Sequence, residues 1–138
     1  MESSVNVNQA QRKSGEGRYQ VMGVVNYCGR GVSFTIFGGE QPHIGSVVLS
    51  TPRPSLVNEK ITSVTSSVLN VVGHKDEEVA RFAAENAARR LNVVTVAAAG
   101  IHVEKAKPEE LTILMKNATE VVDGLLSDLE ERKCGASV

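Results

Sequence analysis

In the first half of the chain, hydrophobic and polar positions follow the two-residue period of β-strands. Residues 19–27 and 32–36 predict two strands, and the glycine-rich CGRG turn between them predicts a hairpin. A third strand is expected over residues 44–50. The following TPRPS segment should end that strand, because proline cannot donate to a sheet ladder. Residues 61–72, rich in Val, Ser and Thr, predict a fourth strand.

The second half of the chain changes to the period of an amphipathic helix. Residues 76–91 predict a helix with acidic residues in its first turn, followed by a buried strand over residues 93–99. A second helix is expected from Pro108, since proline is favoured at the first helical position. The apolar stripe of the first helix is Val79, Phe82, Ala83, Ala87 and Leu91. The stripe of the second is Leu111, Leu114, Met115, Ala118, Val122, Leu125 and Leu129.

These elements predict a single α+β domain over residues 18–131, in the order β-β-β-β-α-β-α. We expect a mixed or antiparallel sheet of about five strands, with both helices packed on one face. Residues 1–17 and 132–138 are polar and are expected to be disordered tails. Aromatic residues make up only 4% of the chain, which predicts a thin core. We therefore expect a second subunit over the open sheet face or an edge, and so a homodimer.

Composition narrows the classes of function. Hydrophobic residues are 41% and charged residues 22%, and the formal net charge is -1, which offers no overall attraction to nucleic acid or an anionic membrane. We expect neither as a partner. No stretch is long and apolar enough for a membrane span, and the N-terminus does not resemble a signal peptide. The two cysteines, Cys28 and Cys134, have no CxxC spacing, which fits a reducing cytoplasm.

The three histidines of the chain are the strongest candidates for a site. His43, His74 and His102 each lie in a glycine-flanked segment at a strand break or strand end. Imidazoles from separate strands can bind a divalent metal and leave one coordination position open. The alternative is three ordinary histidines, each hydrogen-bonded to backbone. If the fourth and fifth strands are parallel neighbours, His74 and His102 lie at the same end of the sheet.

Other residues near these histidines offer further chemistry. Asp76 and Glu77 could supply a carboxylate ligand or orient a ring. Lys75, at the start of the first helix, could bind a phosphate or simply be a solvated lysine. The Gly38–Gly39 pair allows close approach of a ligand or a tight turn with positive φ. Nucleotide-binding, protease and hydrolase signatures such as GxxxxGK[ST], HExxH and GxSxG are absent from the sequence.

Three segments in order resemble one known family. GGEQPHIGSVVLS, VVGHKDEEVARFAAENAARRL and AAGIHVEKAKPEEL are similar to the prenylated-flavin chaperones, the LpdD-like proteins. The resemblance covers roughly residues 31–126. Such proteins accompany decarboxylases that use prenylated flavin mononucleotide, the gallate type among them. This chain departs from the pattern at Ser46 and in the TPRP stretch, which leaves the residues that would face the isoalloxazine undefined.

The resemblance implies an accessory role without catalysis: binding prenylated FMN, or FMN, and helping to deliver it to an apo-decarboxylase or mature it there. It implies His43, His74 and His102 as ligands of a divalent metal. It also implies that Lys75, His43 and the Gly38–Gly39 turn lie beside the flavin phosphate. The metal and anion site is also supported by residue chemistry, whereas the flavin and the decarboxylase partner come only from the resemblance.

Two other functions compete with this one. In a small metal-dependent hydrolase, a histidine-bound metal would activate water with Glu77 or Asp76 as the general base. The absence of an HExxH-type arrangement argues against it. In a dimeric assembly protein, the chain would dock on a partner through a strand edge, and replacing all three histidines would leave binding unchanged.

Overall fold

The computed structural model describes residues 8–71 and 75–136 of the 138-residue chain, with side chains through residue 132. Its elements form one sheet backed by two helices. In chain order they are β1 (Asn8–Ser14), the 3₁₀ turn η1 (Gly17–Tyr19), β2 (Val21–Tyr27), β3 (Gly31–Gly39), β4 (Ser46–Pro54), β5 (Thr62–Asn70), α1 (Lys75–Leu91), β6 (Val94–His102) and α2 (Pro108–Ala136).

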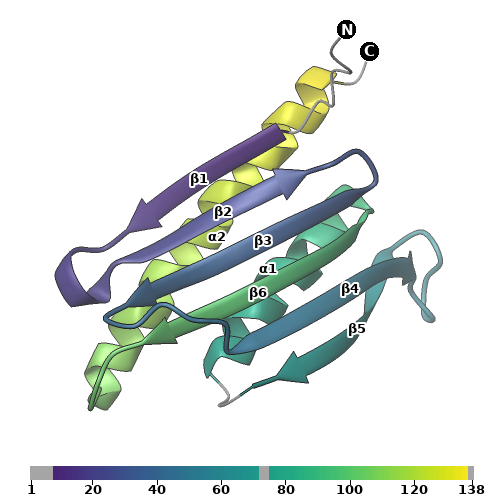
Figure 1. Ribbon diagram of the computed structural model, residues 1–138. Helices are drawn as coiled ribbons and strands as arrows, with labels where there is room; N and C mark the ends of the chain where they lie inside the picture. The colour runs from purple at the N-terminus through teal and green to yellow at the C-terminus, as the bar shows by residue number, and fades with distance from the viewer. Residues whose placement is uncertain (1–7, 72–74, 137–138) are drawn as a thin grey trace, which may run out of the picture.

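The six strands lie in the order β1-β2-β3-β6-β4-β5, and α1 and α2 cover one face, as Figure 1 shows from the other side. Only β3 and β6 are parallel, and every other neighbouring pair is antiparallel. The predicted α+β class, the mixed sheet, the β2–β3 hairpin and the placement of both helices on one face are confirmed. The sheet has six strands, against the expected five or so.

The extra strand comes from a segment where we expected a disordered tail. That prediction is wrong for Asn8–Ser14, which pairs with β2 along its whole length. Its sequence is polar because it forms an edge strand, where the side chains other than Ala10 contact water or helix α2 instead of the core. Arg12 donates to both carboxylate oxygens of Asp128 at 3.0 and 2.8 Å. The expected tail from residue 132 is also wrong in part, because α2 continues to Ala136.

Strand β6 lies between β3 and β4, two strands that precede it in the chain. Residues Gly31–Gly39 pair with Val94–His102 on one side of β6, and Ser46–Ser50 pair with it on the other. The fourth and fifth predicted strands, β5 and β6, are therefore not neighbours, because β4 separates them. They still run in the same direction, so their carboxyl ends lie at the same end of the sheet.

Strand β4 runs past the two prolines that we expected to end it, and this expectation is wrong. Pro52 and Pro54 pair with Val64 and Thr62 of β5. The pairing of β4 with β6 ends at Ser50. Beyond that residue one edge of β4 pairs with no other strand of the described residues, so a residue without an N–H is tolerated there.

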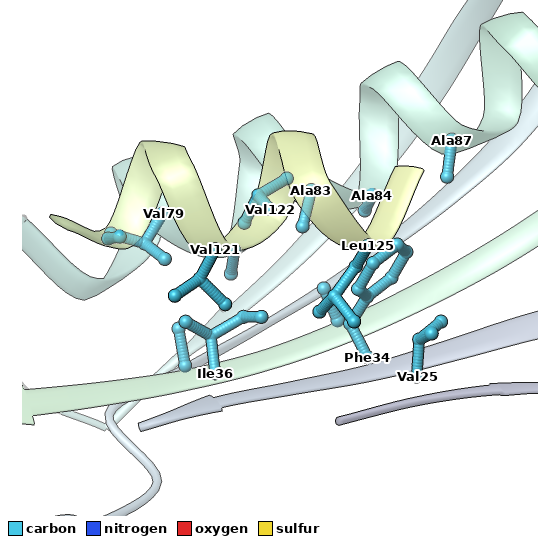
Figure 2. Close-up of a cluster of buried hydrophobic side chains, with 14 of the residues drawn as sticks. Val25, Phe34, Ile36, Val79, Ala83, Ala84, Ala87, Val121, Val122 and Leu125 are labelled. Carbon is cyan, nitrogen blue, oxygen red and sulfur yellow. The ribbon is translucent and has the colours of Figure 1, made fainter. Parts of the chain in front are cut away.

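The core fills the space between the helices and one face of the sheet. Phe34 and Ile36 of β3 point up to both helices, and Val25 of β2 lies beside them (Figure 2). The predicted apolar stripes are buried there, except for Leu111, which is exposed, and Phe82 and Met115, which are partly buried. The residues that α1 buries are mostly alanine, which lets its backbone approach the sheet closely.

Candidate functional site

The candidate site is built around the segment that connects β3 to β4. Because β6 separates these strands, residues 40–45 must cross the carboxyl end of β6. The crossing segment is held there by backbone hydrogen bonds. Glu40 N donates to His102 O at 2.8 Å, His43 N to Gly100 O at 3.4 Å, and Gly45 N to Ala99 O at 2.8 Å. The three bonds fix where His43 lies.

Glycines make this crossing possible. A Cβ atom on Gly100 would collide with the backbone carbonyl of His43, and one on Gly45 would collide with the carboxylate of Asp76. The crossing chain therefore rests directly on the backbone of β6. The glycine-flanked histidine motifs of the sequence are, at His43 and His102, the signature of this close packing.

The Gly38–Gly39 pair is also explained by the protein itself. Gly39 has a φ of 77°, in the left-handed region, and a Cβ there would meet the carbonyl of His102. A Cβ on Gly38 would meet the carbonyl of Gln20. The tight turn with positive φ is thus confirmed for Gly39. Both glycines pack against backbone of this chain.

Asp76 anchors His43 from the first turn of α1. Its side chain is buried, at 5% exposure, and its Oδ1 accepts a hydrogen bond from the backbone N–H of Ile101 at 3.0 Å. Its Oδ2 lies 3.1 Å from His43 Nε2. One carboxylate thereby joins the start of α1, the end of β6 and the crossing segment. This contact matches the second role that the sequence suggested for Asp76, the orientation of a histidine ring.

Both ring nitrogens of His43 face hydrogen-bond acceptors. Nδ1 lies 3.0 Å from the carbonyl oxygen of Gln41, and Nε2 contacts the Asp76 carboxylate. A neutral imidazole carries only one N–H, so both bonds form together only in the imidazolium. The His43 side chain is 40% exposed, so solvent reaches the ring. The ring is therefore held between the crossing segment and the start of α1.

His102 lies next to His43. The ring centroids are 6.4 Å apart, with the ring planes nearly perpendicular at 80°. His102 Nε2 lies 3.1 Å from a carboxylate oxygen of Glu104, and Glu104 N donates to Glu40 Oε1 at 3.0 Å. The structure therefore brings two of the three predicted histidines together. His74 and Gly73 lie outside the described residues.

The part of the chain that the structure describes contains no group of three or more His, Cys, Asp or Glu side chains placed to hold a metal. Glu77, the other suggested ligand or base, accepts from Asn70 Nδ2 at 2.7 Å and forms an ion pair with Arg81 at 2.8 Å. The sequence analysis suggested Glu77 or Asp76 as the general base of a hydrolase. Both carboxylates are engaged in contacts within the chain.

A second cluster of charges adjoins the crossing segment, and sequence reasoning missed it. Arg18 lies 3.2 Å from Glu110 and 4.0 Å from Glu40, and the Tyr19 hydroxyl donates to Glu110 Oε2 at 2.7 Å. The backbone N–H of Lys107, then the Tyr19 hydroxyl, lower the pKa of Glu110. The bond to Glu110 raises the pKa of Tyr19. The one feature of the sequence that hinted at this cluster was Glu40, which directly follows the Gly38–Gly39 pair.

Two further findings concern the cysteines and the possibility of a membrane-spanning helix. Cys28 is exposed and its thiol is free. Within the described residues, neither helix is long and apolar enough to cross a membrane.

Taken together, the fold and this site define a small two-layer α+β domain with a histidine–carboxylate pair at the crossing of β6. The chain belongs to the family of prenylated flavin chaperone LpdD-like domains, whose model matches residues 15–130. The resemblance seen in the sequence is thereby confirmed.

Comparison with solved structures finds a similar fold in another protein. A chain from the crystal structure of a chaperone complex for yeast 20S proteasome assembly is similar, with a TM-score of 0.57 and 12% sequence identity. The match covers 91% of this chain and 96% of that chain. At this identity the similarity shows the fold alone. No curated protein matches the chain.

Proposed function

We propose that this protein is a non-catalytic, cytoplasmic chaperone for prenylated FMN that helps deliver the cofactor to, or mature it in, an aromatic acid decarboxylase. The observation that carries the proposal is the family match over residues 15–130. The site is consistent with it, because the crossing of β6 presents the half-exposed ring of His43 to solvent next to the start of α1. The free thiol of Cys28 fits a reducing compartment.

We propose that the flavin phosphate binds beside His43 and Lys75. Lys75 is the first residue of α1 and directly precedes Asp76, the partner of His43. The N-terminus of a 17-residue helix favours an anion through its dipole and its unpaired N–H groups. His43 lies at the same place and adds positive charge there when its ring is protonated. The Gly38–Gly39 turn, next to the crossing segment, forms the other side of this proposed site.

A divalent metal at His43, His74 and His102 is a separate part of the proposal, with less support. A metal-bound imidazole nitrogen carries no proton. His43 would therefore give up its bond to Gln41 or to Asp76 if it took a metal.

Flavin binding tests the central claim. The full chain, incubated anaerobically with prenylated FMN or with FMN and then desalted, should retain a flavin absorbance spectrum. Lys75→Ala should weaken binding about 10-fold, because a charged contact to phosphate contributes roughly 1.5 kcal/mol. Lys60→Ala, in the exposed loop between β4 and β5, is the matched control and should bind as the wild type does.

Two results would contradict the proposal. The first is a wild-type chain that retains neither flavin. The second is equal flavin affinity of the Lys75 and Lys60 variants, which would move the phosphate away from α1. Delivery is tested by adding the loaded protein to an apo-decarboxylase and measuring decarboxylation against free cofactor. An equal rate with free cofactor would remove the chaperone role.

Metal analysis of the purified protein tests the metal separately. We expect bound divalent metal in the wild type and its loss in His102→Ala, which removes one candidate ligand. If the wild type holds no metal and a chelator leaves flavin binding unchanged, the metal is excluded and the flavin proposal stands.

A further inference from the structure

The sheet face opposite the helices, called here the open face, is unusually apolar. In a strand, every second residue shares a face. The registers place Val24, Thr35, Ala98, Val47 and Leu69 side by side in one row across β2, β3, β6, β4 and β5. Four of these five side chains are apolar.

The next row on the open face is apolar only at the centre of the sheet, with Asn26, Ser33 and Ser67 on the outer strands. It places Val96 of β6 beside Leu49 of β4. The two central strands β6 and β4 thus carry apolar residues on both faces over these rows. A sheet with one face in water normally alternates apolar and polar residues, whereas strands covered on both sides are apolar throughout. Residues 47–49 of β4 and 96–98 of β6 are therefore typical of strand segments that are buried on both faces.

The apolar residues of the open face are not part of the core. None of Val24, Val47, Val96 and Ala98 belongs to the cluster of buried residues or to the side chains packed against it. Leu49 is 43% exposed and Leu69 is 73% exposed. Folding of one chain leaves these residues in contact with water.

Charged residues are confined to the margins of the open face. Among the described residues, Lys13 lies on the edge strand β1, Arg53 near the end of β4, and His102 at the end of β6. The rows between them carry no charge. A partner surface here needs no complementary charge, and a second copy of this surface meets no like charge across the contact.

The whole open face, including the end of β6 that the crossing segment covers, has about the area that a dimer interface needs. Six strands of seven to nine residues form it. With about 4.8 Å between strands and about 3.3 Å per residue, the face measures on the order of 700–800 Å². Stable interfaces bury about 800 Å² on each partner.

We propose that a second copy of this chain packs on the open face, sheet against sheet, to form a homodimer with four layers, α/β/β/α. A two-fold contact requires one surface to complement itself, and an uncharged apolar sheet face does so. Two sheets pack about 10 Å apart with their side chains interdigitated. The crossing segment lies on the same face over Gly100, so the partner sheet contacts the rows away from that end. This proposal stands independently of flavin binding.

The mass of the full chain in solution tests the dimer. Light scattering or sedimentation from about 1 to about 100 µM should give twice the chain mass. Thr35→Lys places a charge in the central row at an exposed position, so the monomer tolerates it. It should weaken the dimer about 100-fold or more, because two like charges then meet in an apolar interface. Leu49→Glu should have the same effect.

Ile113→Glu is the matched control. Ile113 lies on α2 with 41% exposure, close to the 43% of Leu49, but on the other side of the molecule. The control should remain dimeric, and circular dichroism should show all three variants folded. A monomeric wild type at the highest concentration overturns the proposal, even if a decarboxylase then binds this face. A dimer that Thr35→Lys and Leu49→Glu leave intact also overturns it.

Discussion

The two faces of the sheet differ in what covers them, although the same strands build both. On the helix-covered face of β3, Phe34 and Ile36 are 1% and 0% exposed. On the open face of the same strand, Thr35 is exposed and Phe37 is only partly buried. The covered face gives the monomer its stability. The open face is left for contacts that the monomer does not make, and it carries the crossing segment with the candidate site.

The largest expected difference between the faces comes from two phenylalanines of β3. Phe34→Ala should lower the free energy of unfolding by about 3–5 kcal/mol, because it leaves a cavity in the core. Phe37→Ala should cost the monomer about 1 kcal/mol or less. Urea denaturation at low protein concentration measures both. Equal losses would show that the open face is as important to the monomer as the core is.

The crossing segment is the exception to the rule that the open face tolerates change. Gly100→Ala should cost about 1–3 kcal/mol, because its Cβ collides with the His43 carbonyl and the backbone must move. Gly31→Ala is the control on the same face, since its Cβ would lie 3.7 Å from the nearest atom, an ordinary contact. Thermal unfolding of both variants checks the contrast. Unchanged stability in Gly100→Ala would mean that residues 40–45 do not rest on β6.

The smallest effect is expected at the margin of the covered face, where Arg12 of β1 meets Asp128 of α2. The hydrogen bond from Arg12 lowers the pKa of Asp128. A lowered folded-state pKa stabilises the fold above the ordinary carboxyl range and loses this effect as the pH falls through the folded value. Asp128→Asn should therefore lower the melting temperature by only about 2 °C at neutral pH.

The pH dependence gives this last prediction its control. The difference in melting temperature between wild type and Asp128→Asn should shrink below about pH 4, where carboxylates are protonated. Asp123→Asn, an exposed position on the same helix, should show a smaller difference at neutral pH. A difference that stays constant into acid would mean that Asp128 does not act through its charge.

The periodic parts of the fold could be predicted from the sequence. Both helices and the β2–β3 hairpin follow from local spacing, because their apolar stripes and their turn are contiguous in the chain. Strand β1 could not be predicted, because it has no apolar alternation. Pairing with β2 and contacts from α2 hold it in place, as Arg12 with Asp128 and Ser14 with Glu120 show.

The candidate site was only partly predictable for a similar reason. The glycines beside His43 and His102 marked the right segments of the chain. In the fold, however, their role is in packing, because they allow one backbone to cross closely over another. The contact of His43 with Asp76 joins residues 33 positions apart and depends on β6 lying between β3 and β4. No local pattern encodes that strand order. Asp76 was expected at a helix start for its charge, and its burial became visible only in the folded chain.

The position of β6 also orders events during synthesis. Until residues 94–102 leave the ribosome, the earlier strands can form only two separate ribbons, β1-β2-β3 and β4-β5, because the strand that joins them has not been made. Each ribbon then exposes an edge whose partner arrives last. Nascent chains halted before residue 94 should therefore bind holding chaperones and be cleaved by proteases, and release of β6 should end both together.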